Sequence, residues 1–209
     1  MSRKYKHIIF DIDGTLLDTE HAILQSLKDT VNSLLHKDIP ANNLKFALGI
    51  PGNVTLQKLG FTDTVTANLV WNTYLHNYKS SIKLFNGIQD LLHALKTKRY
   101  SLGIVTSKTR QEFSTDFSQP FKISGIFDTV ICVEDSSLPK PFPEPLLAYL
   151  DAANTNPQDA IYIGDTIYDS QCARSAEIDF GLASWGNTTS QGIPADYIFK
   201  MPNDILLSL

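Results

Sequence analysis

The fold of this chain is decided by the stretch Lys6-His7-Ile8-Ile9-Phe10-Asp11-Ile12-Asp13-Gly14-Thr15-Leu16-Leu17-Asp18-Thr19-Glu20. Its apolar part, residues 7–10, has no polar alternation, which predicts a short strand buried on both faces. Asp11 and Asp13 follow where that strand ends. Because side chains two positions apart on an extended backbone point the same way, both carboxylates are expected to face one site. Gly14 lets the chain turn sharply beside that site.

Two neighbouring carboxylates repel each other unless a cation or a shared proton compensates. Mg²⁺ is a suitable cation, because proteins hold it with one or two carboxylates together with substrate phosphate. The alternative is that Asp11 and Asp13 only cap the next helix or stabilise a tight turn. Motifs elsewhere in the chain distinguish the metal site from the helix cap or turn.

Length and composition restrict the class of protein. The 209 residues suffice for one sizeable core, or for a core with a smaller inserted domain. A hydrophobic content of 43% with 19% charged residues is typical of a soluble globular protein. The net charge of −4 and the lack of a basic block argue against a nucleic-acid partner.

The cysteines and the N-terminus indicate a compartment. Cys132 and Cys172 lie in apolar surroundings without metal-type spacing, which predicts buried free thiols in a reducing compartment. The first strand follows Met1 too closely for a signal peptide. No apolar run approaches the roughly 20 residues that span a bilayer. We therefore expect a cytoplasmic protein with no membrane partner. Its expected assembly is a monomer or homodimer.

The region after the first strand is predicted to be helical throughout. Apolar residues recur at helical spacing from residue 23 to residue 35, and Pro40 is expected to end that helix. Shorter helices are predicted at 42–48, 54–59 and 64–78, with a break at Gly49-Ile50-Pro51-Gly52. The apolar stripe that contains Trp71 is interpreted as packing. Such an all-helical block between strand-containing stretches indicates an insertion.

From Gly87 onward, helices and strands alternate. Strands are predicted at 100–105, 129–133, 160–163 and 180–184, with a small edge strand at 197–199. This alternation predicts an α/β fold with a doubly wound, Rossmann-like parallel sheet that is covered on both faces. The core comprises residues 1–16 and 83–209, and the helical insertion comprises residues 17–82.

Polar residues follow the carboxyl ends of several predicted strands, where open parallel sheets bind ligands. Asp11 and Asp13 follow the first strand. Thr106 and Ser107 follow the second strand, and Lys140 lies in the loop after the third. Asp165 and Asp169 follow the fourth. Carboxylates, hydroxyls and an amine at one edge suit phosphoryl transfer, in which alignment and charge neutralisation dominate.

These segments also carry a family resemblance that covers essentially the whole chain. Residues 11–19, Asp-Ile-Asp-Gly-Thr-Leu-Leu-Asp-Thr, resemble the first signature of the haloacid dehalogenase superfamily, and specifically its phosphatase branch. The dehalogenases themselves lack an acid at the position of Asp13. Thr106 is similar to the second signature, and Lys140 in Lys-Pro-Phe-Pro to the third. Residues 164–169, Gly-Asp-Thr-Ile-Tyr-Asp, resemble the fourth signature.

The resemblance implies a reaction and a cofactor. Asp11 would be the nucleophile that forms an aspartyl-phosphate, and Asp13 the general acid and base. Mg²⁺ would be bound by Asp11, by Asp165 and by the backbone carbonyl of Asp13.

The resemblance also implies phosphate-binding roles for Thr106, Ser107 and Lys140. Asp169 is expected to orient metal-bound water or Lys140 rather than to bind the metal. Many relatives have glycine where Pro139 precedes Lys140.

The helical insertion resembles the small cap domain that many relatives place between the first and second signatures. Its break at Gly49 and Pro51 resembles a cap loop that faces the active site in phosphoglycolate phosphatase-like proteins. Those often carry an arginine shortly before the glycine, whereas this chain has Lys45. A cation there suits an acidic substrate, and an ordinary interhelical turn is the alternative.

The leading functional hypothesis is a Mg²⁺-dependent phosphatase for a small phosphorylated metabolite, with phosphoglycolate as the first guess. Pyrophosphate and nucleotide or sugar phosphates are the next candidates. A sugar-phosphate mutase similar to β-phosphoglucomutase could use the same site. A phospho-accepting signalling domain is a remote alternative, because receiver domains lack the acid at Asp13 and need no helical insertion.

Overall fold

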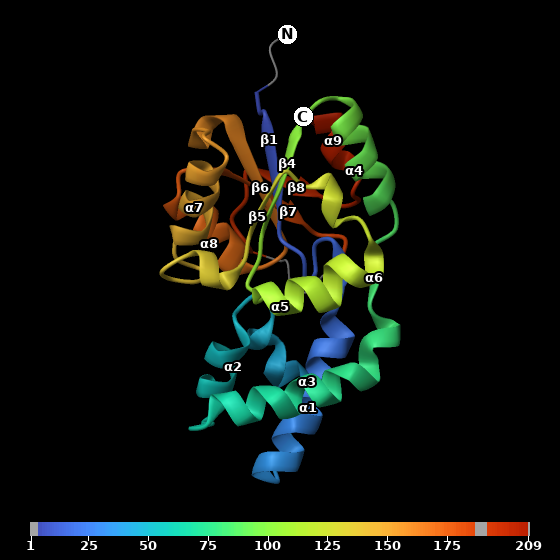
Figure 1. The fold of residues 1–209 in the computed structure, drawn as a ribbon, viewed down its shortest axis with the longest axis vertical. Coiled ribbons are helices and arrows are strands. Elements are labelled where there is room, and N and C mark those ends of the chain that lie inside the picture. The colour runs from blue at the N-terminus through green and yellow to red at the C-terminus, as the bar shows by residue number, and fades with distance from the viewer. Residues whose placement is uncertain (1–3, 187–191, 209) are drawn as a thin grey trace.

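A six-stranded sheet forms the centre of the computed structural model, which describes residues 4–186 and 192–208 (Figure 1). In spatial order its strands are β5 (Thr129–Ile131), β4 (Ser101–Val105), β1 (His7–Phe10), β6 (Ala160–Gly164), β7 (Asp179–Ala183) and β8 (Tyr197–Phe199). All neighbouring strands pair in parallel. The predicted doubly wound α/β sheet is confirmed, and the predicted edge strand lies at its edge.

Apolar side chains explain why the sheet is buried on both faces. In β1, Ile8 and Phe10 pack on one face and Ile9 packs on the other. The helices that cover the sheet are α4 (Ile88–Thr97) and α9 (Asp204–Ser208) on the first face, and α7 (Glu144–Ala152) and α8 (Ile167–Ser175) on the second (Figure 1). The strand order reverses at β1, so the carboxyl end of β1 is the expected place for a ligand.

Residues 20–81 contain helices and no strand. They comprise α1 (Glu20–Leu35), a 3-10 stretch (Ala41–Ala47), α2 (Gly52–Lys58), α3 (Thr64–Tyr78) and a 3-10 turn (Lys79–Ser81). This helical segment has its own apolar core, which includes Leu27 and Trp71. The helix α1 ends at Leu35, before the expected end at Pro40, because His36 adopts a left-handed conformation with φ of 53°.

A short antiparallel ribbon joins the helical segment to the sheet. It pairs β2 (Leu17–Asp18) with β3 (Lys83–Leu84). The two crossings between the helical segment and the sheet are therefore hydrogen-bonded to each other. Strands of two residues are too short to produce a periodic pattern. The predicted division into residues 1–16 with 83–209 and residues 17–82 cuts this ribbon, and it stays a prediction.

A helical stretch over residues 110–121 follows β4 and lies between the sheet and the helical segment (Figure 1). It consists of α5 (Arg110–Glu112), a π-helical part (Phe113–Ser118) and α6 (Gln119–Phe121). Thr109 begins it with a capping box, because its side chain accepts from Glu112 N while Glu112 accepts from Thr109 N.

The two thiols are buried and unpaired, as the sequence predicts. Burial raises the pKa of Cys132 to about 11 and that of Cys172 to about 12. Within residues 4–186 and 192–208, no helix has both the length and the apolar surface that crossing a bilayer requires.

Candidate active site

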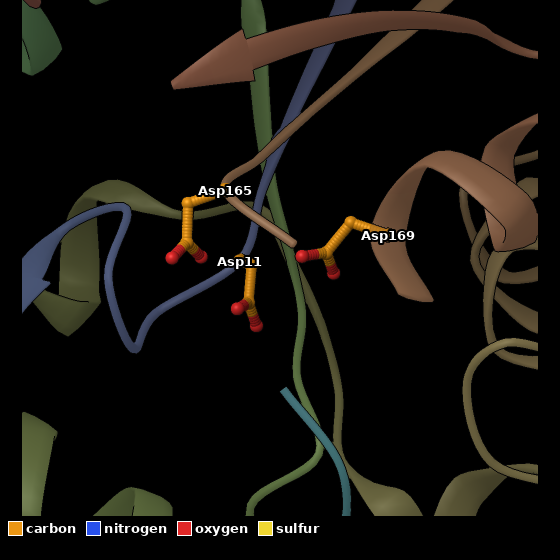
Figure 2. A group of neighbouring side chains, drawn as sticks. All are labelled: Asp11, Asp165 and Asp169. Atoms are coloured by element: carbon orange, nitrogen blue, oxygen red, sulfur yellow. The ribbon is translucent and has the colours of Figure 1, made fainter. Parts of the chain in front are cut away.

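Three carboxylates converge at the carboxyl ends of β1 and β6. One oxygen from each of Asp11, Asp165 and Asp169 lies within 4.8 Å of the other two (Figure 2). Asp11 directly follows β1, Asp165 directly follows β6, and Asp169 lies in the first turn of α8. All three side chains are buried. The predicted convergence of the first and fourth sequence signatures is therefore present in the fold.

Gly14 makes this convergence possible. A Cβ atom at Gly14 would lie 2.1 Å from Asp165 Oδ2, and Gly14 has a φ of +79° that other residues rarely adopt. The neighbouring Thr15 hydroxyl donates to Asp165 Oδ1 at 3.4 Å. The turn after β1 therefore packs directly on the carboxylate of Asp165.

Lys140 is the buried cation of the site. Its Nζ lies 3.0 Å from Asp11 Oδ1 and 2.7 Å from Asp169 Oδ1, and it donates to the Tyr162 hydroxyl at 3.2 Å. Burial by itself lowers the pKa of Lys140, but Asp11 and Asp169 outweigh it and hold that pKa above the ordinary value. The amine therefore stays charged.

Asp169 has no oxygen left for a metal ion. Its Oδ1 accepts from Lys140 and lies 2.9 Å from the Tyr162 hydroxyl. Its Oδ2 accepts from the backbone N–H of Thr166 at 3.0 Å and from the Thr166 hydroxyl at 2.6 Å. Asp169 therefore contacts Lys140, and its role in orienting that amine stays a prediction.

Asp11 has one oxygen that a cation could use. Asp11 Oδ2 is buried and has no hydrogen-bond partner. Burial raises the pKa of Asp11 to about 7, although the nearby Lys140 opposes this shift. A hard cation that is bound by carboxylate oxygens would offset the cost of burying this charge. Asp11 and Asp165 therefore fit the Mg²⁺ ion that the sequence predicts.

Asp13 is paired with a lysine that the sequence analysis missed. Lys108 Nζ lies 2.9 Å from Asp13 Oδ2, whereas Asp13 Oδ1 is buried without a hydrogen-bond partner. Burial lowers the pKa of Lys108, but Asp13, Asp116 and Glu112 outweigh it and raise that pKa above its ordinary value. Lys108 could have been predicted as a site residue from its position two residues after Thr106, at the end of the same strand. Tyr162 was also missed, because it lies in an otherwise apolar strand.

The hydroxyl residues after β4 lie at the same edge of the sheet. Thr106 is buried, and its Oγ1 accepts from the backbone N–H of Lys108 at 3.2 Å. The Ser107 hydroxyl donates to the backbone carbonyl of Gly49 at 3.0 Å. This hydrogen bond connects the loop after β4 to the helical segment.

Gly49 also contacts the core through Thr166. A Cβ at Gly49 would lie 2.7 Å from Thr166 Oγ1, and the φ of Gly49 is +84°. We expect Gly49→Ala to lower stability by about 1–3 kcal/mol through overpacking and backbone strain. Because it pushes the helical segment away from the core, it should also lower kcat/KM by about tenfold.

Thermal unfolding and steady-state kinetics measure both effects. Gly60→Ala is the matched control, since Gly60 has a φ of +89° but nothing within 4 Å of its Cβ position. It should lower stability through strain alone and leave kcat/KM unchanged. Equal kinetics for the two variants would contradict the contact between Gly49 and Thr166.

A cavity of about 80 Å³ lies between the core and the helical segment. Core residues that line it include Asp11, Asp13 and Lys108, and Gly49 lines it from the helical segment. Trp71 lines it too, so this residue has two roles. It packs in the core of the helical segment, where its Nε1 donates to Ser26 Oγ at 2.9 Å, and it forms part of the cavity wall.

Two of the three residues that were predicted to select substrate do not line this cavity. Lys45 forms an ion pair with Glu20 at 3.0 Å. Pro51 is buried directly before α2. Of these three residues, only Gly49 lines the cavity. Lys45, the predicted cation for an acidic substrate, is therefore not in the cavity wall.

The fold is that of the haloacid dehalogenase-like hydrolases. The model of that family matches residues 8–183, and the chain belongs to it. It is similar to the pyrophosphatase PpaX of Bacillus velezensis, with 27% identity over 206 residues that cover 95% of this chain and 94% of the relative. The PpaX of Bacillus cereus is 25% identical over 203 residues, which cover 95% and 94%.

A solved structure is also similar over the whole chain. It is a Lactobacillus plantarum protein assigned as a phosphoglycolate phosphatase, with a TM-score of 0.87 and 29% identity. The match covers 98% of this chain and 99% of that one. The sequence resemblance to the superfamily is therefore confirmed, and the chain is an enzyme of the hydrolase class.

Proposed function

We propose that this enzyme is a Mg²⁺-dependent phosphatase that hydrolyses a small phosphomonoester through an aspartyl-phosphate on Asp11. One observation carries the proposal. Asp11 Oδ2 and Asp13 Oδ1, both buried and without hydrogen-bond partners, belong to carboxylates that line one cavity. Native proteins rarely leave such atoms unpaired, and a catalytic role or a bound ion is among the reasons for the exceptions.

In the first step, the Asp11 carboxylate attacks phosphorus and the bond from phosphorus to the ester oxygen breaks. Asp13 donates its proton to the departing oxygen, so the leaving group departs as a neutral alcohol. Lys108 Nζ lies 2.9 Å from Asp13 Oδ2 and holds this carboxyl group in place, so the proton is carried on Oδ1, which has no hydrogen-bond partner. The products of this step are the alcohol and the aspartyl-phosphate.

In the second step, Asp13 accepts a proton from a water molecule that attacks phosphorus. The bond from phosphorus to Asp11 then breaks, which releases inorganic phosphate and restores the carboxylate. In both steps the Lys140 charge and the Thr106 hydroxyl stabilise the negative charge on the phosphoryl oxygens.

Mg²⁺, held by Asp11, Asp165 and the backbone carbonyl of Asp13, would neutralise phosphoryl charge when bound. The helical segment is proposed to act as a cap that excludes bulk water from the cavity. The hydrogen bond from Ser107 to Gly49 supports that role, because it links the segment to the core beside the site.

Pyrophosphate hydrolysis is the second candidate function. Its support is the similarity to relatives named pyrophosphatase PpaX, which extends over 95% of the chain. The same residues could attack a phosphoanhydride, because the nucleophile and the phosphate-binding groups are unchanged.

Purified protein incubated with p-nitrophenyl phosphate tests the proposed function. We expect release of nitrophenol and phosphate in the presence of Mg²⁺, and a rate at least about tenfold lower after chelation of the metal. Restoring Mg²⁺ should restore the rate. The proposal is wrong if the protein releases no phosphate, or if chelation leaves the rate unchanged.

A further inference from the structure

The wall of the cavity carries charged side chains that a leaving group would meet. In the proposed reaction, Asp11 is the nucleophile and Asp13 is the general acid and base. The wall contains two more acids, Glu112 and Asp116, both from the helical stretch after β4. A leaving group that enters this cavity therefore meets two carboxylates that have no part in the proposed chemistry.

The lysines near the cavity are already paired. Among the described residues that line it, Lys108 is the only basic one, and its Nζ is bound to Asp13. Lys140 is engaged by Asp11 and Asp169. Lys79 lies 3.0 Å from Asp116 from outside the described wall, and because its side chain is 39% exposed it offsets only part of the Asp116 charge. A second anionic group on the substrate would therefore face Glu112, and the lysine in the described wall is already held against Asp13.

Uncharged hydrogen-bonding groups are available instead. Asn68 and Asn72 of α3 line the cavity beside Trp71. An amide side chain offers two donors and one acceptor, which suits hydroxyl groups. The aromatic wall suits the carbon atoms that carry those hydroxyls.

The volume limits the size of the leaving group. A cavity needs roughly 10–15 Å³ to hold one water molecule. The cavity of about 80 Å³ therefore holds only a few water-sized groups. A phosphoryl group with a short carbon chain fits this space.

We propose that the preferred substrate is the phosphomonoester of a short, uncharged polyol, and that Glu112 and Asp116 exclude leaving groups that carry a second negative charge. This inference rests on the proposed phosphatase function and specifies its substrate class. It departs from the phosphoglycolate first guess, because phosphoglycolate carries a carboxylate on its leaving group. It also separates this enzyme from a pyrophosphatase.

Phosphate release from three compounds of similar size tests the selectivity. They are glycerol 3-phosphate, 2-phosphoglycolate and pyrophosphate, each measured at the same Mg²⁺ concentration. We expect kcat/KM for glycerol 3-phosphate to exceed both others by about tenfold or more, since like charges in a partly buried site repel strongly. Equal or faster hydrolysis of phosphoglycolate or pyrophosphate would overturn the inference. A lack of phosphate release from all of them and from p-nitrophenyl phosphate would overturn the proposed function itself.

Glu112→Gln shows whether the wall charge causes the selectivity. Glutamine still accepts the hydrogen bond from Thr109 N, so the capping box survives. We expect the preference for glycerol 3-phosphate over phosphoglycolate to fall about fivefold, and Asp116→Asn to change it in the same direction. Asp90→Asn is the control, because it removes one charge from an exposed position on α4, away from the cavity. An unchanged preference in both wall variants would overturn the assignment of selectivity to these carboxylates.

Discussion

Asp11→Asn is expected to abolish turnover, with kcat reduced by about 10⁴-fold or more. An amide oxygen is a poor nucleophile towards phosphorus, and asparagine cannot form the aspartyl-phosphate. The loss should therefore appear with every substrate that the wild type accepts. Steady-state phosphate release measures it, and the intact mass of acid-quenched enzyme shows whether one phosphoryl group is attached in wild type and absent in the variant.

Folding is the control for this variant. Asparagine has nearly the shape of aspartate, and Lys140 keeps its contact with Asp169. The variant should therefore unfold cooperatively at nearly the same temperature as wild type. Full turnover by a folded Asp11→Asn protein would exclude Asp11 as the nucleophile and would remove the basis of the proposed mechanism.

Lys140→Met is expected to damage both stability and catalysis. Lys140 contacts two buried carboxylates, Asp11 at 3.0 Å and Asp169 at 2.7 Å. Removing one partner of a buried ion pair costs about 3–5 kcal/mol, because it leaves an uncompensated charge. Loss of the phosphate-binding cation should lower kcat/KM by about 10³-fold. Chemical denaturation and steady-state kinetics give the two values.

Two further variants separate these effects. Lys96→Met removes a lysine whose ion pair with Asp128 is exposed, with side chains 36% and 48% accessible. It should cost about 0–1 kcal/mol and leave activity unchanged. Combining Lys140→Met with Asp169→Asn should recover part of the lost stability but none of the activity. If Lys140→Met alone is as stable as wild type, the buried pairs do not have the energetic role that their geometry indicates.

Much of the site follows from local sequence. Asp11, Thr106 and Asp165 each follow an apolar strand directly, and the carboxyl ends of parallel strands meet at one edge of a sheet. Gly14 by itself predicts that the backbone approaches the site closely after β1. The helical segment was equally clear, because its apolar positions repeat at helical spacing.

Other features depend on contacts that no local pattern records. The ribbon of β2 and β3 joins residues 17–18 to residues 83–84, and two-residue strands have no period. Lys45 was expected to select substrate, yet Glu20 pairs with it outside the cavity wall. Lys108 was not singled out, yet it pairs with Asp13.

The sequence by itself determined the α/β class, the order of the four signatures and the chemical groups that reach the end of the sheet. Strand ends and side-chain types depend on short-range pattern, so they can be predicted from the chain alone. Only the tertiary structure decided which charges neutralise each other and which residues form the cavity wall. Those outcomes depend on the packing of elements that are distant in sequence, because a lysine binds whichever carboxylate the fold places within about 3–4 Å of it. The charge that a substrate meets is therefore a property of the assembled site.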